Sequence, residues 1–165
     1  MSSISSLQLK RPAWQTAVIF TLTFWLSTSL VLDLVIMPGL YASGMMSQSG
    51  FATAGYLIFW AFNRIELLCA AFVLTGVLIL KRTQNTWVSH NRSTTVLAMV
   101  LLTIALIFTY VLTPNMSALG LNIEILNPVA AVPGGMDLLH EIYWVLEVIK
   151  LVVGGAVLSL FYRQN

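Results

Sequence analysis

The sequence predicts an all-α protein, a four-helix transmembrane bundle, and two observations carry this prediction. Of the 165 residues, 58% are hydrophobic and only 8% are charged, whereas soluble domains carry about 25% charged residues. Four apolar stretches are also each long enough to cross the hydrocarbon core of a bilayer, which needs about 20 helical residues. We therefore expect one membrane domain over residues 1–165, with spans at about 13–37, 56–80, 94–113 and 139–162.

The first two spans are bounded by residues that end helices or flank membranes. The first follows a polar tail, residues 1–12, and its apolar run is too long for a signal peptide, so we expect a retained helix. It should end at Pro38 and Gly39, a pair that terminates helices. The second span should begin near Tyr56 and end before Lys81 and Arg82.

The last two spans differ in their charge. The third contains no charged residue and should end at Pro114. After it, the mildly apolar segment 119–126 is expected to lie along the membrane surface. The fourth span carries four ionisable side chains in an otherwise apolar run, which is costly unless they face protein or water. These four side chains are His140, Glu141, Glu147 and Lys150.

The positive charges that flank the spans predict the orientation of the protein. In a four-span topology they all fall on one side of the membrane: Lys10, Arg11, Lys81, Arg82, Arg92 and Arg163. Because Lys and Arg are enriched in cytoplasmic flanks, both termini should be cytoplasmic, or stromal in a photosynthetic membrane. We therefore expect a multi-pass protein of the bacterial inner membrane or of a thylakoid membrane.

Polar residues within the spans predict a buried polar cluster. Its expected members are Asp33, Asn63, Arg64, Glu66, His140, Tyr143, Glu147 and Lys150. On a helix, residues three and four positions apart share a face, which aligns His140, Tyr143, Glu147 and Lys150. We expect Asp33 to pair with Arg64, and Glu66 with Lys150. Such pairs either fix how the helices pack, relay protons or ions, or hold a cofactor or metal.

The charge count and the methionines bear on these alternatives. Together with Glu141, the cluster has four acidic and two basic residues, an excess of two negative charges. A protonated Glu, a protonated His140, exposure of Glu141 at the interface or a bound cation would account for this excess. A weak copper site is also conceivable at the outer side, from Met45, Met46, Met136 and His140. Thioether and imidazole ligands suit Cu(I), although Met is equally common as a filler of apolar gaps. Copper or haem is thus an alternative to the expectation of no cofactor.

The sequence favours a non-enzymatic role. It contains no Ser-His-Asp, zinc-protease or paired-Cys constellation, and a net charge of +2 gives no basic patch for nucleic acid. We expect an accessory or assembly component of a larger membrane complex, in contact with lipid and with another membrane protein or further copies of itself. The alternative is a small conduit or binding protein for protons or metal ions that uses the buried charges.

Three short motifs carry a resemblance to a known family. The first span ends in residues 37–41 (MPGLY), the second contains residues 63–66 (NRIE), and the last opens with residues 139–140 (LH). In these motifs the chain resembles a family of small four-helix membrane proteins from bacteria and cyanobacteria, described as a domain of unknown function. Its four-span layout is also similar to the copper-resistance D membrane domain, whose dense Met and His clusters this chain lacks.

Overall fold

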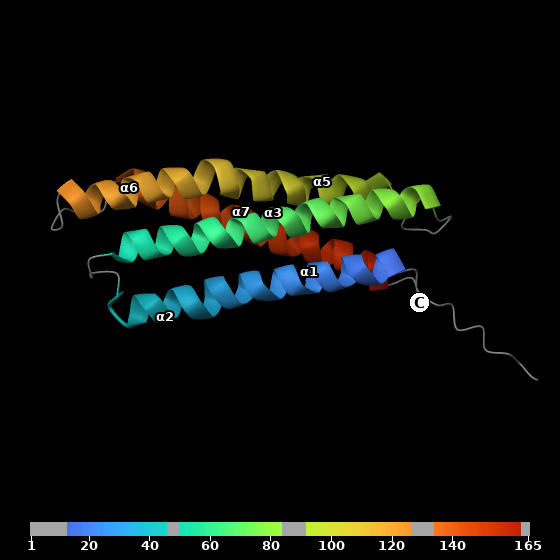
Figure 1. Cartoon of the computed structure of the whole chain (residues 1–165), viewed down its shortest axis with the longest axis horizontal. Helices are drawn as coiled ribbons and strands as arrows, with labels where there is room; N and C mark the ends of the chain where they lie inside the picture. Colours follow the sequence, from blue (N-terminus) through green and yellow to red (C-terminus); the bar gives the residue numbers. More distant parts are fainter. Residues whose placement is uncertain (1–12, 46–49, 84–91, 127–133, 163–165) are drawn as a thin grey trace, which may run out of the picture.

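A computed structural model describes residues 13–45, 50–83, 92–126 and 134–162, and in these residues the chain forms four long antiparallel helical rods (Figure 1). The predicted all-α, four-helix bundle is confirmed. Each rod contains a helix that is long and apolar enough to cross a membrane, as a multi-pass membrane protein requires. The polar tail expected at residues 1–12 lies outside the described residues.

Two of the four rods are single helices and two are interrupted by a wider turn. The first rod consists of α1 (Ala13–Val31), the π-helical turn η1 (Leu32–Ile36) and α2 (Met37–Ala42). The second is α3 (Phe51–Thr83). The third consists of α5 (Arg92–Ile107), the π-helical turn η3 (Phe108–Leu112) and α6 (Thr113–Leu126), and the fourth is α7 (Gly134–Tyr162).

The rods run further than the sequence predicts, because neither proline ends its helix. A proline lacks the N–H of a helical residue, and its ring crowds the carbonyl four residues earlier. Before Pro38, the Met37 N–H bonds to Leu32 O, five residues back, and before Pro114 the Thr113 N–H bonds to Phe108 O in the same way. Each π turn widens the helix just before its proline. Residues 119–126 therefore continue α6 and do not form a separate surface segment.

The four rods pack as a square in which α1 and α5 each contact α3 and α7. The core between them is built from aliphatic side chains such as Val73, Val77 and Leu101, which are at most 2% exposed. Glycines let α1 approach closely on both sides. A Cβ on Gly76 of α3 would overlap the Val18 methyl, and one on Gly154 of α7 would lie 2.7 Å from a Leu26 methyl.

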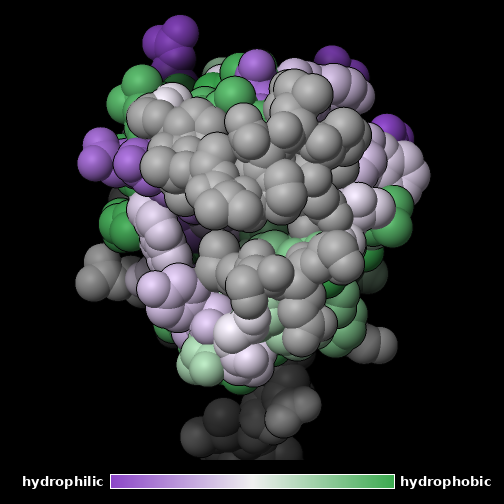
Figure 2. All heavy atoms as spheres, turned by 90° about the vertical axis from the view of Figure 1, so that its left-hand side faces the viewer, coloured by the Kyte–Doolittle hydropathy of each residue, from purple (hydrophilic) through white to green (hydrophobic). Residues whose placement is uncertain are grey.

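The bundle has two chemically distinct ends. At one end, which we call the basic end, α1 begins, α7 ends, α3 finishes with Lys81 and Arg82, and α5 starts at Arg92. At the opposite end, the far end, α3 and α7 begin (Figure 1). Figure 2 views the far end, where hydrophilic and hydrophobic side chains alternate around the rim. The 33 residues of α3 span about 50 Å, so the bundle exceeds a hydrocarbon core of about 30 Å.

Candidate functional site

The centre of the candidate site is an ammonium group held between two carboxylates. Lys150 Nζ lies 2.5 Å from Glu66 Oε1 and 2.6 Å from Glu147 Oε2, and all three side chains are at most 2% exposed. Glu147 and Lys150 are one turn apart on α7, whereas Glu66 reaches them from α3, which stands diagonally opposite in the square. The structure thus brings together Glu66 and Lys150, the pair expected from the sequence.

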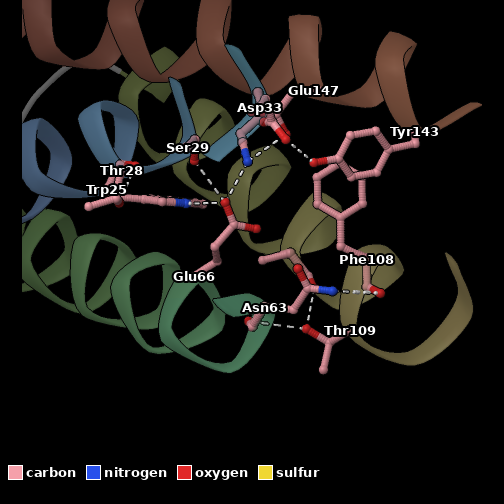
Figure 3. Close-up of polar contacts among 12 residues, drawn as sticks. Trp25, Thr28, Ser29, Asp33, Asn63, Glu66, Phe108, Thr109, Tyr143 and Glu147 are labelled. Carbon is pink, nitrogen blue, oxygen red and sulfur yellow. Dashed lines mark hydrogen bonds and ion pairs between the residues drawn. The ribbon is translucent and has the colours of Figure 1, made fainter. Parts of the chain in front are cut away.

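Helix α1 supplies two further donors to the same carboxylate oxygen. Trp25 Nε1 donates to Glu66 Oε1 at 2.8 Å, and Ser29 Oγ donates to it at 2.9 Å (Figure 3). Sequence reasoning missed both residues. Their spacing was a usable signal, because Trp25, Ser29 and Asp33 are each four positions apart and so follow one face of the first rod.

Asp33 completes the acidic side of the site, and we call Asp33, Glu66, Glu147 and Lys150 the charge cluster. The Tyr143 hydroxyl donates to Asp33 Oδ1 at 2.5 Å, joining α7 to the π turn η1. The Asp33 carboxyl group lies beside that of Glu147 (Figure 3). Asp33 Oδ2 and Glu147 Oε1 are buried and accept no hydrogen bond from any described residue.

The charge cluster is therefore electrically unbalanced. With every group ionised, three carboxylates and one ammonium sum to −2, in residues that are at most 4% exposed. Uncompensated charge of this kind is expensive in a low-dielectric interior. Among the described residues, no group of three or more His, Cys, Asp or Glu side chains is arranged to hold a metal ion. Bound protons or a cation would offset this excess of negative charge.

A second set of polar contacts joins α3 to the third rod at the same level. Asn63 Nδ2 donates to Phe108 O at 3.3 Å and to Thr113 Oγ1 at 2.5 Å, while Thr109 Oγ1 donates to Asn63 O at 3.3 Å. Asn63 thus contacts the η3 region through both its side-chain amide and its backbone carbonyl. Phe108 belongs to the same turn of the third rod, and the centre of its ring lies 5.2 Å from Lys150 Nζ. All four rods are consequently tied together in one layer.

Arg64 does not belong to this layer, so the expected pairing with Asp33 is wrong. Asn63 and Glu66 are three positions apart and both point inward, which turns the intervening Arg64 outward. Its guanidinium lies 4.0 Å from the centre of the Trp60 ring on the exposed side of α3. Asp33 takes its hydrogen bond from Tyr143 instead.

His140 is also outside the buried layer. It stands ten positions before Lys150, which rotates it by roughly 80° from that residue's face on an α-helix. It is exposed, and its Nδ1 lies 2.9 Å from Met136 O in the preceding turn. Of the methionines in the weak copper hypothesis, Met45 is 41% exposed, Met136 is half-buried, and Met46 lies outside the described residues.

Between the charge cluster and the basic end, the bundle is filled with apolar side chains. Along α1, the next buried polar residue after Ser29 in that direction is Gln15, 14 residues or about 21 Å away. Gln15 Nε2 donates to Phe161 O near the end of α7. The site is therefore separated from the basic end by an apolar core and lies near the middle of the bundle, since Glu66 is 15 residues from the start of α3 and 17 from its end.

Comparison of the chain with protein families, characterised proteins and solved structures found no match. The function must therefore be argued from the site and the surface of this chain.

Proposed function

We propose that this chain is a non-enzymatic accessory or assembly component of a larger membrane complex. It would lie in a bacterial inner membrane or a thylakoid membrane, with the basic end and both termini on the cytoplasmic or stromal side. The observation that carries the proposal is the layer of charges described above. These side chains link the first, second and fourth rods through hydrogen bonds and ion pairs above an apolar core, an arrangement suited to fixing a bundle and not to passing a substrate.

The contacts of Glu66 support a structural role for the charges. One oxygen of this carboxylate takes donors from α1 and α7, namely Trp25, Ser29 and Lys150. The Glu66–Lys150 ion pair reaches across the diagonal of the square, as does the edge-to-face contact of Phe59 with Tyr143, so the ion pair helps to fix the depth of α3 relative to α7. Buried polar pairs are best attested in this registering role.

The surface at the far end supports association with a partner. Leu57 lies 24 residues before Lys81 on α3, or about 36 Å along the helix. It is therefore beyond a hydrocarbon core of about 30 Å that starts at Lys81. Leu57, Leu138 and Tyr41 are 57%, 58% and 73% exposed on three different rods. Apolar side chains that are exposed outside the hydrocarbon region, as Leu57 would be, favour contact with another protein.

Affinity purification from native membranes tests this proposal. The tagged chain, solubilised in a mild detergent, should co-purify with a fixed set of membrane proteins at constant stoichiometry. A matched chain with Leu57→Ser and Leu138→Ser should fold and insert but lose those proteins. Recovery of the native chain alone, or as its own oligomer only, would contradict a role in a larger complex.

The unsatisfied oxygens of Asp33 and Glu147 favour a second candidate, a buried proton-binding site. Two buried carboxyl groups side by side can share a proton, which removes part of the excess negative charge. Infrared spectroscopy of the reconstituted protein should then show a carboxylic acid carbonyl band that disappears in Glu147→Gln. A spectrum unchanged by both Glu147→Gln and Asp33→Asn would exclude this candidate.

A further inference from the structure

A small pocket opens between α3 and the third rod, on the far-end side of the charge cluster. Its volume is about 220 Å³, and its walls include Arg64, Trp60, Tyr110 and Thr113. It is independent of the charge cluster, because Arg64 points away from Glu66 on the opposite side of α3. Each wall contributes an aromatic and a polar side chain, Trp60 and Arg64 from α3 and Tyr110 and Thr113 from the third rod.

The cation in this pocket has no carboxylate counter-ion within the part of the chain that the structure describes. Arg64 forms no ion pair with a carboxylate of any described residue, and its guanidinium contacts the face of Trp60 at 4.0 Å. A guanidinium stacked on an aromatic ring keeps its edge and its N–H donors free for a planar or tetrahedral anion. Thr113 adds a further donor, since its Oγ1 accepts from Asn63 and the hydroxyl hydrogen is left for another acceptor.

The position of Arg64 along α3 identifies where that anion would lie. Arg64 is 17 residues from Lys81, or about 26 Å along the helix. If Lys81 marks one boundary of a hydrocarbon core of about 30 Å, Arg64 lies close to the other boundary. Trp60, one turn further out, and Tyr110 are 44% and 65% exposed, and Trp and Tyr are the residues enriched at that level.

We propose that this pocket binds the phosphate group of an anionic phospholipid in the leaflet at the far end. The lipid headgroup would place its phosphate on Arg64 and the Thr113 hydroxyl, while its chains extend into the bilayer. Basic pockets between transmembrane helices recognise phosphate-bearing headgroups by the same chemistry. Free inorganic phosphate carries the same group and is the alternative source.

Native mass spectrometry of the detergent-solubilised chain, titrated with dioleoyl phosphatidylglycerol, tests the proposal. The tightest binding event should weaken by about tenfold or more in Arg64→Gln, the loss expected for one charge-assisted hydrogen bond. Arg82→Gln makes the same charge change at an exposed position of the basic end and should leave this event unchanged. Because Arg64 is exposed, its variant should melt at the same temperature as the native chain.

Three outcomes would overturn the proposal. Equal weakening by Arg64→Gln and Arg82→Gln would mean that net charge, and not this pocket, attracts the lipid. Equally tight binding of dioleoyl phosphatidylcholine would remove the preference for an anionic headgroup. Displacement of phosphatidylglycerol by millimolar inorganic phosphate, with the same dependence on Arg64, would assign the pocket to free phosphate.

Discussion

Replacement of Lys150 by methionine should be among the most destabilising single changes in this protein. Its ammonium is the shared partner of Glu66 and Glu147. Lys150→Met leaves Glu66 with the donors from Trp25 and Ser29 but leaves Glu147 with no partner among the described residues. Removing one partner of a buried ion pair costs about 3–5 kcal/mol, so we expect a loss of that size in the free energy of unfolding.

Combined substitutions separate the two carboxylates. Glu66→Gln keeps an acceptor for Trp25 and Ser29, and Lys150 keeps Glu147, so this single change should cost only about 1–3 kcal/mol. Adding Glu66→Gln to Lys150→Met should recover part of the loss, because one uncompensated carboxylate disappears. Adding Glu147→Gln as well should recover most of it, with coupling energies of about 0.5–3 kcal/mol.

The free energy of unfolding in detergent micelles, measured by far-ultraviolet circular dichroism, provides the assay for this series. Arg82→Met, which removes an exposed cation from α3, should change it by no more than about 0.5 kcal/mol. Strictly additive losses in the double and triple variants would refute the reasoning, since they would mean that Lys150 interacts with neither carboxylate.

Three further predictions follow from close packing, the polar layer and the topology. Gly76→Ala should cost about 1–3 kcal/mol by forcing α1 away from α3, whereas Gly155→Ala has open space and should be neutral or stabilising. Asn63→Ala should cost about 1–3 kcal/mol by removing two buried hydrogen bonds. In a cysteine-free chain, a cysteine at Thr83 should react only from the cytoplasmic side, and one at Ser43 only from the other.

Each of these predictions has a contradicting outcome. Equal melting temperatures for the two alanine variants at Gly76 and Gly155 would refute the close approach of α1 and α3. A neutral Asn63→Ala would show that the third rod does not depend on this side chain. If the cysteines introduced at positions 83 and 43 were both labelled from the same side, the chain could not cross the membrane an odd number of times between them.

Composition alone predicts the four spans, because lipid requires each crossing to be a long apolar helix. The Glu66 and Lys150 contact could also be predicted, since ionisable groups of opposite charge at similar depth in the membrane need each other. The ends of the helices could not be predicted from the sequence. A π turn lets a helix continue past Pro38 and Pro114, and nothing in the sequence marks such a turn. Arg64 was misplaced because its outward direction depends on which face of α3 carries Asn63 and Glu66 inward.

The apolar core around Val77 and Leu101 closes the charge cluster toward the basic end. Proton flux into liposomes that contain the purified chain and an internal pH-sensitive dye tests this claim most directly. With an imposed pH gradient and a potassium diffusion potential, the rate should equal that of protein-free liposomes. A faster rate that Glu147→Gln abolishes would contradict the account and identify the chain as a proton conduit.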